Sequence, residues 1–558
     1  MKRKFTLIYF LGIFLGLSAQ NHTVGLIKAD NSKTYKGYTL IYPDNQSNVY
    51  LIDNCGRVVH TWLDNDSFRP GNTVHLLEDG SIIKTKRNVN IGGDHIWADG
   101  GGGIVEKRDW NNDLIWIFNL NDSVNRLHHD IEPLINGNIL MLCWEKITRD
   151  QAIAKGRDPN SITNGELWTD KIIEVKPIGK DGFTIVWEWH LWDHVIQDFD
   201  STKSNFGKPA NNIGKINLNY ATSDGTQPWA CINSMSYNKV FDQIVVSSPT
   251  FNEIWIIDHS TSIAESTKSK GGFGQKGGDL LYRWGNPTAS NTGGISDQKL
   301  FYPNDIQWMG LKLGDDNFGK LMVFNSRFGS DHSTVSIIQP VFDTYFWEYI
   351  KSGNGYMPKS VSWTYKREDS TAMYSPDNSS VQRLSNGNTF ICSARQGRVI
   401  EINLQKEIVW EYIMPLKNGR PVSQGDNILT GENIVCNAKR FPTDFPAFAG
   451  RDLSPKGFIE LKPDSTFCEL AGINIIVEAT GSVKVFPNPA NDNVLVELYS
   501  GTHKINSLEL YSVLGEMIYQ KNNLDLTRFT LDTRDLPDGL YFLTINRNQV
   551  VRKLEVRH

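Results

Sequence analysis

Short apolar runs of about four to eight residues, separated by turns rich in Gly, Asn and Asp, dominate the pattern of polar and apolar positions. No long stretch places apolar residues at the spacing of a helix face. Runs of this length, rich in β-branched and aromatic residues and bounded by turn residues, are typical of strands. The pattern therefore predicts an all-β fold.

One phrase recurs along the first 470 residues: a polar turn, then two or three apolar residues, then tryptophan. Six tryptophans belong to it: Trp62, Trp116, Trp187, Trp284, Trp347 and Trp410. A second phrase, a turn of Asn, Asp and Gly leading into an apolar strand, alternates with the first, as in LINGNILML at residues 134–142. Such units cannot bury their own apolar faces, so repeated sheets must pack on one another. Six copies predict a six-bladed β-propeller within residues 20–470.

A different pattern begins at Gly481, where apolar residues alternate with polar ones between Asn-Pro, Leu-Gly and Asp-Gly turns. This pattern predicts a small antiparallel β-sandwich over residues 481–558, which is long enough to fold independently. The other end of the chain has the pattern of a signal peptide over residues 1–19: basic residues, an apolar run that is too short to span a membrane, and a small-residue cleavage site. We therefore expect an exported protein without a membrane span in its mature form.

Composition and charge exclude some functions. A formal net charge of -5 and a pI near 6.2 give no basic footprint for nucleic acid. The six cysteines are widely separated and form no CxxC pair, so the sequence predicts no metal centre and leaves fifteen full disulfide pairings open. No cofactor motif is apparent, and no cofactor is expected.

The C-terminal segment resembles the C-terminal sorting domain of the type IX secretion system of Bacteroidetes. The resemblance rests on FPNP at 486–489, LYSVLG at 510–515 and DLPDGLYFL at 535–543, followed by a basic end with Lys553. It implies that the type IX secretion machinery is a partner and that the protein is secreted or displayed at the cell surface.

The preceding part resembles the bacterial arylsulfotransferases. The phrases that carry the resemblance are HHDI at 128–131, WEWHLWDHVIQDFD at 187–200 and GGDLLYRWGNP at 277–287. The resemblance implies transfer of a sulfuryl group from an aryl sulfate to a phenol through a covalent sulfohistidine. In that chemistry a neutral histidine is the nucleophile, and other histidines and an arginine hold the sulfuryl oxygens.

The resemblance assigns the family's roles to positions of this chain one by one. The first family histidine falls on His129, or less favourably on His128. The second falls on Cys231, and the asparagine that accompanies it is kept as Asn233. The family arginine falls on Pro249, and the nucleophilic histidine falls on Asn304. Three of the four positions have thus changed, so the family mechanism cannot run here as it stands.

Alternatives follow from these changes. Cys231 or His129 is a conceivable replacement nucleophile, but the partners that would activate either are replaced. An exported arylsulfotransferase-like enzyme with altered catalysis is one interpretation. A non-catalytic propeller that binds a small aromatic sulfate or phenol is the other. A propeller dehydrogenase with a quinone cofactor gains no support, because its metal and cofactor residues are not recognisable.

Four further features are candidate sites. His190 and His194 have the spacing of zinc ligands on a helix, but the interleaved tryptophans favour a packed structural insertion. His332 and Arg395 precede strands and could line the central funnel, although solvated turns are the favoured interpretation. The glycine run 100–103 lacks the strand, helix and spacing of a phosphate-binding loop.

Overall fold

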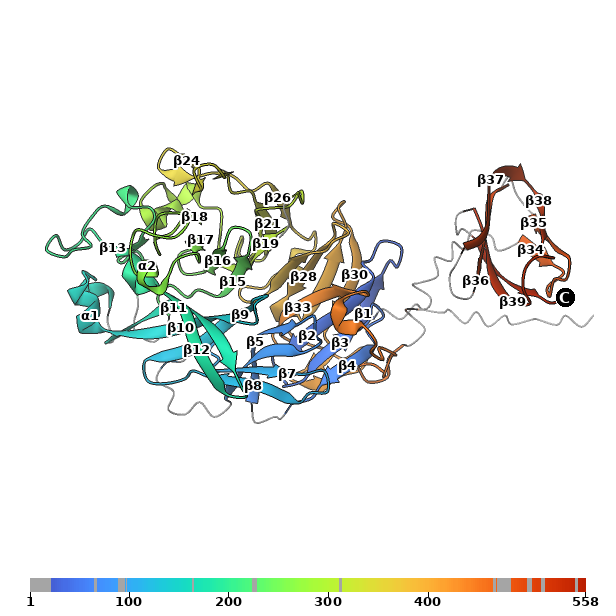
Figure 1. Cartoon of the computed structure of the whole chain (residues 1–558), viewed down its shortest axis with the longest axis horizontal. Coiled ribbons are helices and arrows are strands. Elements are labelled where there is room, and N and C mark those ends of the chain that lie inside the picture. The colour runs from blue at the N-terminus through green and yellow to red at the C-terminus, as the bar shows by residue number, and fades with distance from the viewer. Residues whose placement is uncertain are drawn as a thin grey trace, which may run out of the picture. The chain divides into compact units, whose positions relative to one another are not determined.

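The computed structural model describes residues 22–558 except 65–67, 89–95, 97, 163–164, 223–227, 311–313, 465–467, 469–482, 499–503, 513–516 and 547–549. The chain divides into two compact units, Met1–Cys468 and Glu469–His558. The predicted signal peptide, residues 1–19, and the predicted boundary near residue 481 lie outside the described residues. The all-β prediction is confirmed, because the described helices are short and strands make up the core of both units (Figure 1).

Six antiparallel sheets of four or five strands account for most of the described larger unit. The first three are β33-β2-β3-β4, β5-β6-β7-β8 and β12-β11-β10-β9. Their strands are β2 (Gly37–Pro43), β3 (Val49–Ile52), β4 (Val58–Trp62), β33 (Val435–Pro442), β5 (Phe68–Leu76), β6 (Ile82–Asn88), β7 (Ile104–Arg108), β8 (Leu114–Asn119), β9 (Asn125–Pro133), β10 (Ile139–Thr148), β11 (Glu166–Ile178) and β12 (Gly182–His190).

The other three sheets are β15-β16-β17-β18, β19-β20-β21-β26 and β27-β28-β29-β30-β1. Their strands are β15 (Ser234–Asn238), β16 (Gln243–Ser248), β17 (Glu253–Asp258), β18 (Tyr282–Trp284), β19 (Pro303–Met309), β20 (Lys320–Asn325), β21 (Thr334–Ile338), β26 (Trp363–Tyr365), β27 (Ser380–Arg383), β28 (Thr389–Ser393), β29 (Arg398–Ile402), β30 (Ile408–Ile413) and β1 (Gly25–Ala29).

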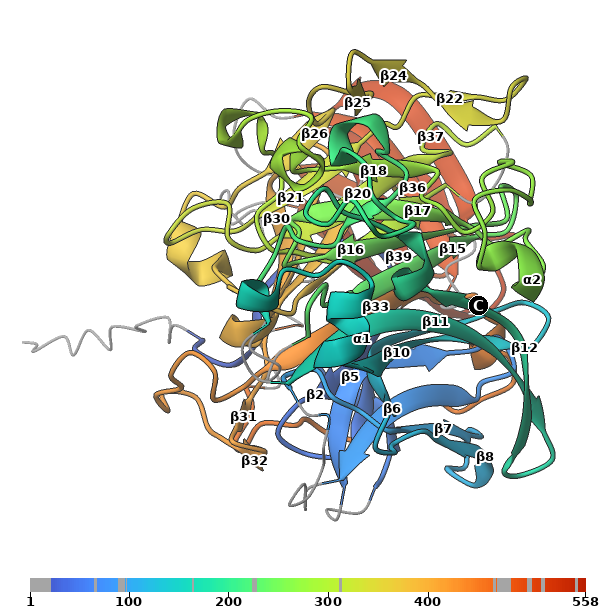
Figure 2. The same cartoon turned by 90° about the vertical axis from the view of Figure 1, so that its left-hand side faces the viewer.

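Shorter helices and strands lie between these strands along the chain. They are α1 (Arg149–Ala154), α2 (Ile263–Ser266), β13 (Val195–Ile196), β14 (Ile216–Asn217), β22 (Phe342–Asp343), β23 (Glu348–Tyr349), β24 (Lys351–Ser352), β25 (Gly355–Tyr356), β31 (Leu416–Lys417) and β32 (Arg420–Pro421). The β11–β12 hairpin is long, and its tip lies beside β8 (Figure 2). Among the described residues no helix is long and apolar enough to cross a membrane.

The six sheets are joined in a closed ring through one strand of each. These six strands, called the inner strands, contact each other in the order β5, β9, β15, β19, β27, β33 and back to β5. β33, near the end of the unit, pairs with β2, near its start, in the register Leu40↔Lys439. The first and last parts of the unit therefore share one sheet, which closes the ring.

Most of the recurring tryptophans link one sheet to the next. Four of the six indole N–H groups donate to a backbone carbonyl of the following sheet or of the loop beside it. The pairs are Trp62 to Asp109 (3.0 Å), Trp116 to Gly182 (2.9 Å), Trp284 to Pro358 (2.6 Å) and Trp410 to Asn54 (2.8 Å). Because a buried indole N–H needs an acceptor, the tryptophan is both an apolar wedge and a polar link between sheets.

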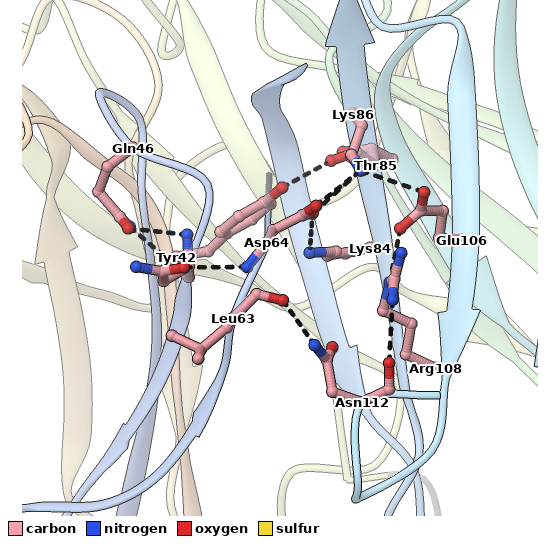
Figure 3. Close-up of polar contacts among 11 residues, drawn as sticks. Tyr42, Gln46, Leu63, Asp64, Lys84, Thr85, Lys86, Glu106, Arg108 and Asn112 are labelled. Atoms are coloured by element: carbon pink, nitrogen blue, oxygen red, sulfur yellow. Dashed lines mark hydrogen bonds and ion pairs between the residues drawn. The ribbon is translucent and has the colours of Figure 1, made fainter. Parts of the chain in front are cut away.

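A buried ion network joins the first two sheets (Figure 3). The side chains of Lys84 and Lys86 on β6 both contact the carboxylate of Asp64, and Lys86 Nζ also lies 3.1 Å from Glu106 Oε1. Lys84 and Asp64 are 0% and 3% exposed. Burial lowers the pKa of Lys84 to about 8, against the attraction of Asp64. The network therefore links two sheets with charges that have little access to solvent.

One disulfide is formed among the described cysteines, between Cys55 and Cys468. It joins the loop after β3 to the last described residue of the larger unit. Cys143, Cys231, Cys392 and Cys436 are free thiols. The structure thus selects one pairing where the sequence left fifteen full arrangements open.

The C-terminal unit contains a three-stranded sheet, β34-β35-β38, and a four-stranded sheet, β37-β36-β39-β40. Their strands are β34 (Val483–Phe486), β35 (Asn493–Leu498), β36 (Ile505–Ser512), β37 (Met517–Leu526), β38 (Arg528–Asp532), β39 (Gly539–Ile545) and β40 (Val550–Val556). Val494 and Leu531 of the first sheet share one apolar cluster with Leu508 and Leu543 of the second. The two sheets therefore have a common core.

Candidate functional site

Six pairs of residues, one pair at the inner strand of each sheet, line a small cavity where the six inner strands meet. The pairs are Asn72–Thr73, His129–Asp130, Asn233–Ser234, Asn304–Asp305, Asn378–Ser379 and Cys436–Asn437. The first residue of every pair also lines a wider neighbouring cavity of about 230 Å³. The ring of sheets thus brings together side chains that are up to 365 positions apart in the sequence, from Asn72 to Asn437.

The second residue of several pairs ties one sheet to the next. Asp130 Oδ2 accepts a hydrogen bond from Met235 N (2.9 Å), and Ser234 Oγ accepts one from Ile306 N (2.9 Å). Asp305 Oδ2 accepts one from Val381 N (2.6 Å). These side chains satisfy backbone donors of the neighbouring inner strand, so their role is to hold the ring together.

The backbone is unusual at this ring. His129, Cys231, Tyr302, Asp305, Asn378 and Ser379 all have positive φ, between 43° and 86°. The β9–β10 and β19–β20 ladders shift register next to His129 and Asp305. Bulges redirect side chains, and strained backbone of this kind gathers at functional sites. The strained positions therefore mark the cavity as the candidate site.

Four of the five predicted site residues, His129, Cys231, Asn233 and Asn304, line the wider cavity. The other residues of its lining are Asp44, Asn72, Arg87, Asp99, Gly100, Pro228, Tyr302, Asp377, Asn378, Arg395, Ile434 and Cys436. His128 does not belong to this lining and is buried behind it, stacked on Trp144 with ring centroids 4.5 Å apart. Pro249 is also absent from the lining.

His129 is held from two sides. Its backbone N–H donates to Gly100 O (2.7 Å), and a Cβ built on Gly100 would lie 2.1 Å from His129 Nε2. Its Nδ1 lies 3.0 Å from His128 Nδ1. Burial, and then the neighbouring His128, holds the pKa of His129 well below its usual range. His129 is therefore a neutral imidazole at neutral pH, and Gly100 is required because the ring occupies the space of a side chain.

Cys231 is not an activated thiol. Burial, reinforced by the nearby carboxylates of Asp170 and Asp99, raises the pKa of its thiol well above the usual range. A cysteine nucleophile needs a stabilised thiolate, usually beside a cation or a helix N-terminus. The surroundings of Cys231 do the opposite, so the alternative of a cysteine nucleophile loses support.

Both the nitrogen and the oxygen of the Asn304 amide form hydrogen bonds within the protein. Its Nδ2 donates to Tyr302 O (3.1 Å) and Ser326 Oγ (2.6 Å), and its Oδ1 accepts from the amide of Asn233. Asn233 Oδ1 in turn accepts from Ser247 Oγ (2.6 Å). The two amides form part of the cavity wall, and neither offers a basic or nucleophilic atom.

Two arginines line the cavity, each paired with a carboxylate. Arg395 makes a bidentate contact with Asp377 (2.7 and 2.9 Å), and Arg87 lies 2.9 Å from Asp44. Asp99 adds a further carboxylate to the lining. For Arg395 a solvated turn was favoured over the funnel, and the structure places the residue in the cavity wall. The charges of both arginines are balanced, so neither is a free holder of sulfuryl oxygens.

The remaining candidates lie elsewhere. His190 Nδ1 is 2.9 Å from Glu145 Oε2, whereas His194 Nδ1 is 2.8 Å from Asp279 Oδ1 and its other nitrogen contacts Ser266 O. The two histidines thus have separate partners, as expected of a packed insertion. His332 contacts Asp331 beside it. Within the described ranges no group of three or more His, Cys, Asp or Glu residues is arranged to hold a metal ion.

Sequence reasoning missed Asn72, Asn378 and Cys436, and it assigned no role to Gly100. The first three stand at the positions of their inner strands that correspond to His129, each followed by Thr, Ser or Asn. This correspondence could have identified them from the sequence. However, the insertions between the six repeats differ in length, so the repeats cannot be aligned residue by residue.

The fold and the cavity define an all-β protein whose chemistry-bearing side chains gather at the centre of a ring of sheets, followed by a separate β unit. Residues 23–286 match the model of the arylsulfotransferase family, and residues 484–557 match the model of the secretion system C-terminal sorting domain. The chain therefore combines an arylsulfotransferase-family region with a type IX sorting domain, and both resemblances are confirmed. The sorting domain indicates secretion or a cell-surface location.

The family match includes His129, Cys231 and Pro249 but ends before Asn304. No curated protein matches the chain. Solved structures that resemble it include a protein of unknown function from Bacteroides caccae, with 11% identity, a TM-score of 0.39, and coverage of 73% of this chain and 99% of that one. A virginiamycin B lyase from Staphylococcus aureus has 11% identity, a TM-score of 0.30, and coverage of 71% and 90%. Similarities this low say nothing about activity.

Proposed function

We propose that this chain is an exported arylsulfotransferase-like protein that binds a small phenol or aryl sulfate in its central cavity and does not use the family's sulfohistidine chemistry. The amide of Asn304 carries this proposal. It stands where the resemblance places the nucleophile, and both its nitrogen and its oxygen form hydrogen bonds within the cavity wall. Binding requires only shape and polar groups, which the cavity has, whereas transfer requires a nucleophile and its partners.

The architecture proposed with this function is a six-bladed β-propeller over residues 20–470, preceded by a signal peptide of residues 1–19 and followed by a sorting β-sandwich over residues 481–558. The closed contact order of six inner strands supports the propeller. The common core of the two C-terminal sheets supports the sandwich. We propose that the propeller is the part that acts outside the cell.

Sulfuryl transfer through His129 is the second candidate. One observation favours it: among the described residues, His129 is the only imidazole in the cavity lining, and its Nε2 makes no hydrogen bond to them. A neutral imidazole nitrogen facing a ligand is the kind of nucleophile that the family chemistry uses.

Incubation of the mature protein with 4-nitrophenyl sulfate and a phenol acceptor tests the choice. We expect binding of the sulfate or of 4-nitrophenol by calorimetry, no release of nitrophenolate above background, and no sulfuryl adduct in intact-protein mass spectra. Asn378→Phe should fill the cavity and abolish binding. Rapid transfer, or an adduct on His129, would establish the second candidate instead, and absence of any binding would remove the proposed function.

The triple variant Cys231→His, Pro249→Arg and Asn304→His tests whether those three side chains are all that the cavity lacks for sulfuryl transfer. A gain of transfer activity would show that the scaffold still positions family groups correctly. No gain would show that the wall built by Asn304, Asn233 and Ser326 no longer has the geometry for transfer.

A further inference from the structure

A buried carboxylate lies behind the two histidines. Asp170 on β11 and His128 on β9 both have fully buried side chains, and His128 Nε2 lies 3.3 Å from Asp170 Oδ1. Asp170 Oδ1 also accepts a hydrogen bond from Ile232 N (3.1 Å), in the loop that carries Cys231. His128 Nε2 and Asp170 Oδ2 have no hydrogen bond of standard geometry to described residues. The Asp170 carboxylate is therefore one polar neighbour of the His128 ring, and the backbone of Cys143, which forms a hydrogen bond with that ring, is another.

The contact between the histidines fixes how protons are placed. His128 Nδ1 and His129 Nδ1 are 3.0 Å apart, which requires one proton between two nitrogens. If His129 donates that proton, neutral His128 carries its own proton on Nε2, toward the Asp170 carboxylate. If His128 donates it, His128 Nε2 is bare and needs a proton from Asp170. The protonation state of Asp170 thus decides whether His129 Nε2, which faces the cavity, carries a proton.

We infer that Asp170, His128 and His129 form a proton relay that lets His129 Nε2 accept a proton from a hydroxyl group bound in the central cavity. This inference rests on the proposed function, because it concerns the ligand of the same cavity. Asp170 and His128 are positioning residues in it, and His129 is the group that touches the ligand.

The relay moves three protons in one direction. The ligand hydroxyl gives its proton to His129 Nε2 and becomes an oxyanion. The proton on His129 Nδ1 passes to His128 Nδ1, and the proton on His128 Nε2 passes to Asp170 Oδ1. The net negative charge leaves Asp170 and appears on the ligand oxygen, and neither imidazole becomes charged.

Burial explains why a relay is needed. A buried imidazolium at His129 is disfavoured, since burial and His128 lower the pKa of His129. Burial has the opposite effect on an acid, and it raises the pKa of Asp170 well above its usual range, against the hydrogen bonds from Ile232 N and Cys231 N. A proton accepted at the cavity is therefore more stable on Asp170 than on the histidine that first receives it.

Other titratable groups face this set from the elements packed around it. They are Glu145 and Cys143 on β10, Cys231 before β15, and the cavity residues Asp44, Arg87, Asp99, Asp377 and Arg395. Because each arginine is paired with a carboxylate, the lining offers little excess positive charge for an anion. The cavity is thus better suited to a neutral hydroxyl donor such as a phenol than to an aryl sulfate.

Nuclear magnetic resonance of the free protein tests the relay without any ligand. In protein labelled with ¹⁵N-histidine, long-range proton–nitrogen spectra distinguish the two neutral tautomers, and His129→Gln identifies the signals. As the pH rises and Asp170 loses its proton, we expect His129 to change from the Nε2–H to the Nδ1–H tautomer while it stays neutral. In Asp170→Asn it should remain Nδ1–H throughout, because an amide cannot take up the proton. Asp279→Asn, which alters the Asp–His contact at His194, should leave the change intact.

A single unchanging tautomer, or an imidazolium at His129, would overturn the relay. Binding of 4-nitrophenol, whose phenolate is coloured, tests its effect on a ligand. The ionisation constant of the bound phenol should fall about tenfold in Asp170→Asn relative to the wild type and Asp279→Asn. An equal constant in all three proteins would show that the relay does not reach the ligand. Failure of 4-nitrophenol to bind would instead count against the proposed function, because the tautomer result is independent of it.

Discussion

The indole of Trp410 donates a hydrogen bond to the backbone carbonyl of Asn54, 2.8 Å away and 356 positions earlier in the chain. The Arg440 guanidinium lies over the same indole, 4.0 Å from the ring centroid. Trp410 therefore joins the last sheet of the ring to the first. We expect Trp410→Phe to lower the free energy of unfolding by about 2–3 kcal/mol, through the lost hydrogen bond and the smaller ring. Urea denaturation monitored by circular dichroism measures this difference in the free energy of unfolding.

Trp347→Phe is the matched control. Trp347 belongs to the same sequence repeat, but its indole N–H is buried without a hydrogen-bond partner among the described residues. Removing an unpaired buried donor recovers some of its desolvation cost, so the loss should be about 1 kcal/mol or less. Equal losses in the two variants would mean that the link between sheets adds nothing to stability.

The contrast between these two tryptophans shows what the sequence could predict about the fold. The alternation of turns and apolar runs was sufficient for the all-β class, whereas the count of six blades from the repeat stays a prediction. Trp347 has the local pattern of the other five, yet it lies in the small β22–β23 hairpin rather than in the outer strand of a sheet. Local patterns do not distinguish an outer strand from a neighbouring hairpin, since both bury an aromatic residue.

The candidate site was predicted only in part. The resemblance led to His129, Cys231, Asn233 and Asn304, and these do line one cavity. Asp170 could not be found in this way, because it becomes a neighbour of His128 only through the pairing of β10 with both β9 and β11. The pairing of Arg395 with Asp377 likewise depends on loops whose conformation is set by tertiary contacts.

The disulfide between Cys55 and Cys468 should contribute to the stability of the larger unit. It connects the first sheet to the end of that unit, so it restricts the unfolded chain over 413 positions. We expect the double variant Cys55→Ser and Cys468→Ser to have a free energy of unfolding about 2–4 kcal/mol lower than that of the wild type. Calorimetry checks this. An unchanged unfolding temperature would show that the ring is closed by its strands and tryptophans alone.

Cys231 should react slowly despite lining the cavity. Because burial and Asp170 raise the pKa of its thiol, little thiolate is present at pH 8. Alkylation of the native protein with iodoacetamide, followed by peptide mass spectrometry, should label Cys231 at least about tenfold more slowly than the urea-unfolded protein. Labelling at the unfolded rate would contradict a protonated thiol and would reopen the question of a cysteine nucleophile.

His259 should make stability depend on pH. Burial favours its neutral form, but hydrogen bonds to Asp242 (2.7 Å) and Glu174 (3.0 Å) outweigh burial and raise the pKa of His259 to about 9. A raised pKa means that the folded state binds the proton more tightly than the unfolded state. The stabilisation is complete below about pH 6.5 and is lost as the pH rises through about 9.

The variant His259→Gln measures this contribution. It should be less stable than the wild type by about 2 kcal/mol at pH 6, and the difference should shrink toward zero above pH 9. Unfolding in urea at a series of pH values gives both curves. Parallel curves would show that the Asp242–His259–Glu174 contact does not bind a proton.

The buried network in Figure 3 should be sensitive to loss of its central carboxylate. In Asp64→Asn the ammonium groups of Lys84 and Lys86 lose an opposing charge, although Lys86 keeps Glu106. Breaking a buried pair from one side leaves an uncompensated charge, so we expect a loss of about 3–5 kcal/mol in the free energy of unfolding. Lys33→Met, which breaks the solvent-exposed pair with Glu407, should cause no measurable change. If Asp64→Asn and Lys33→Met gave the same stability, the network would contribute no more than a surface ion pair.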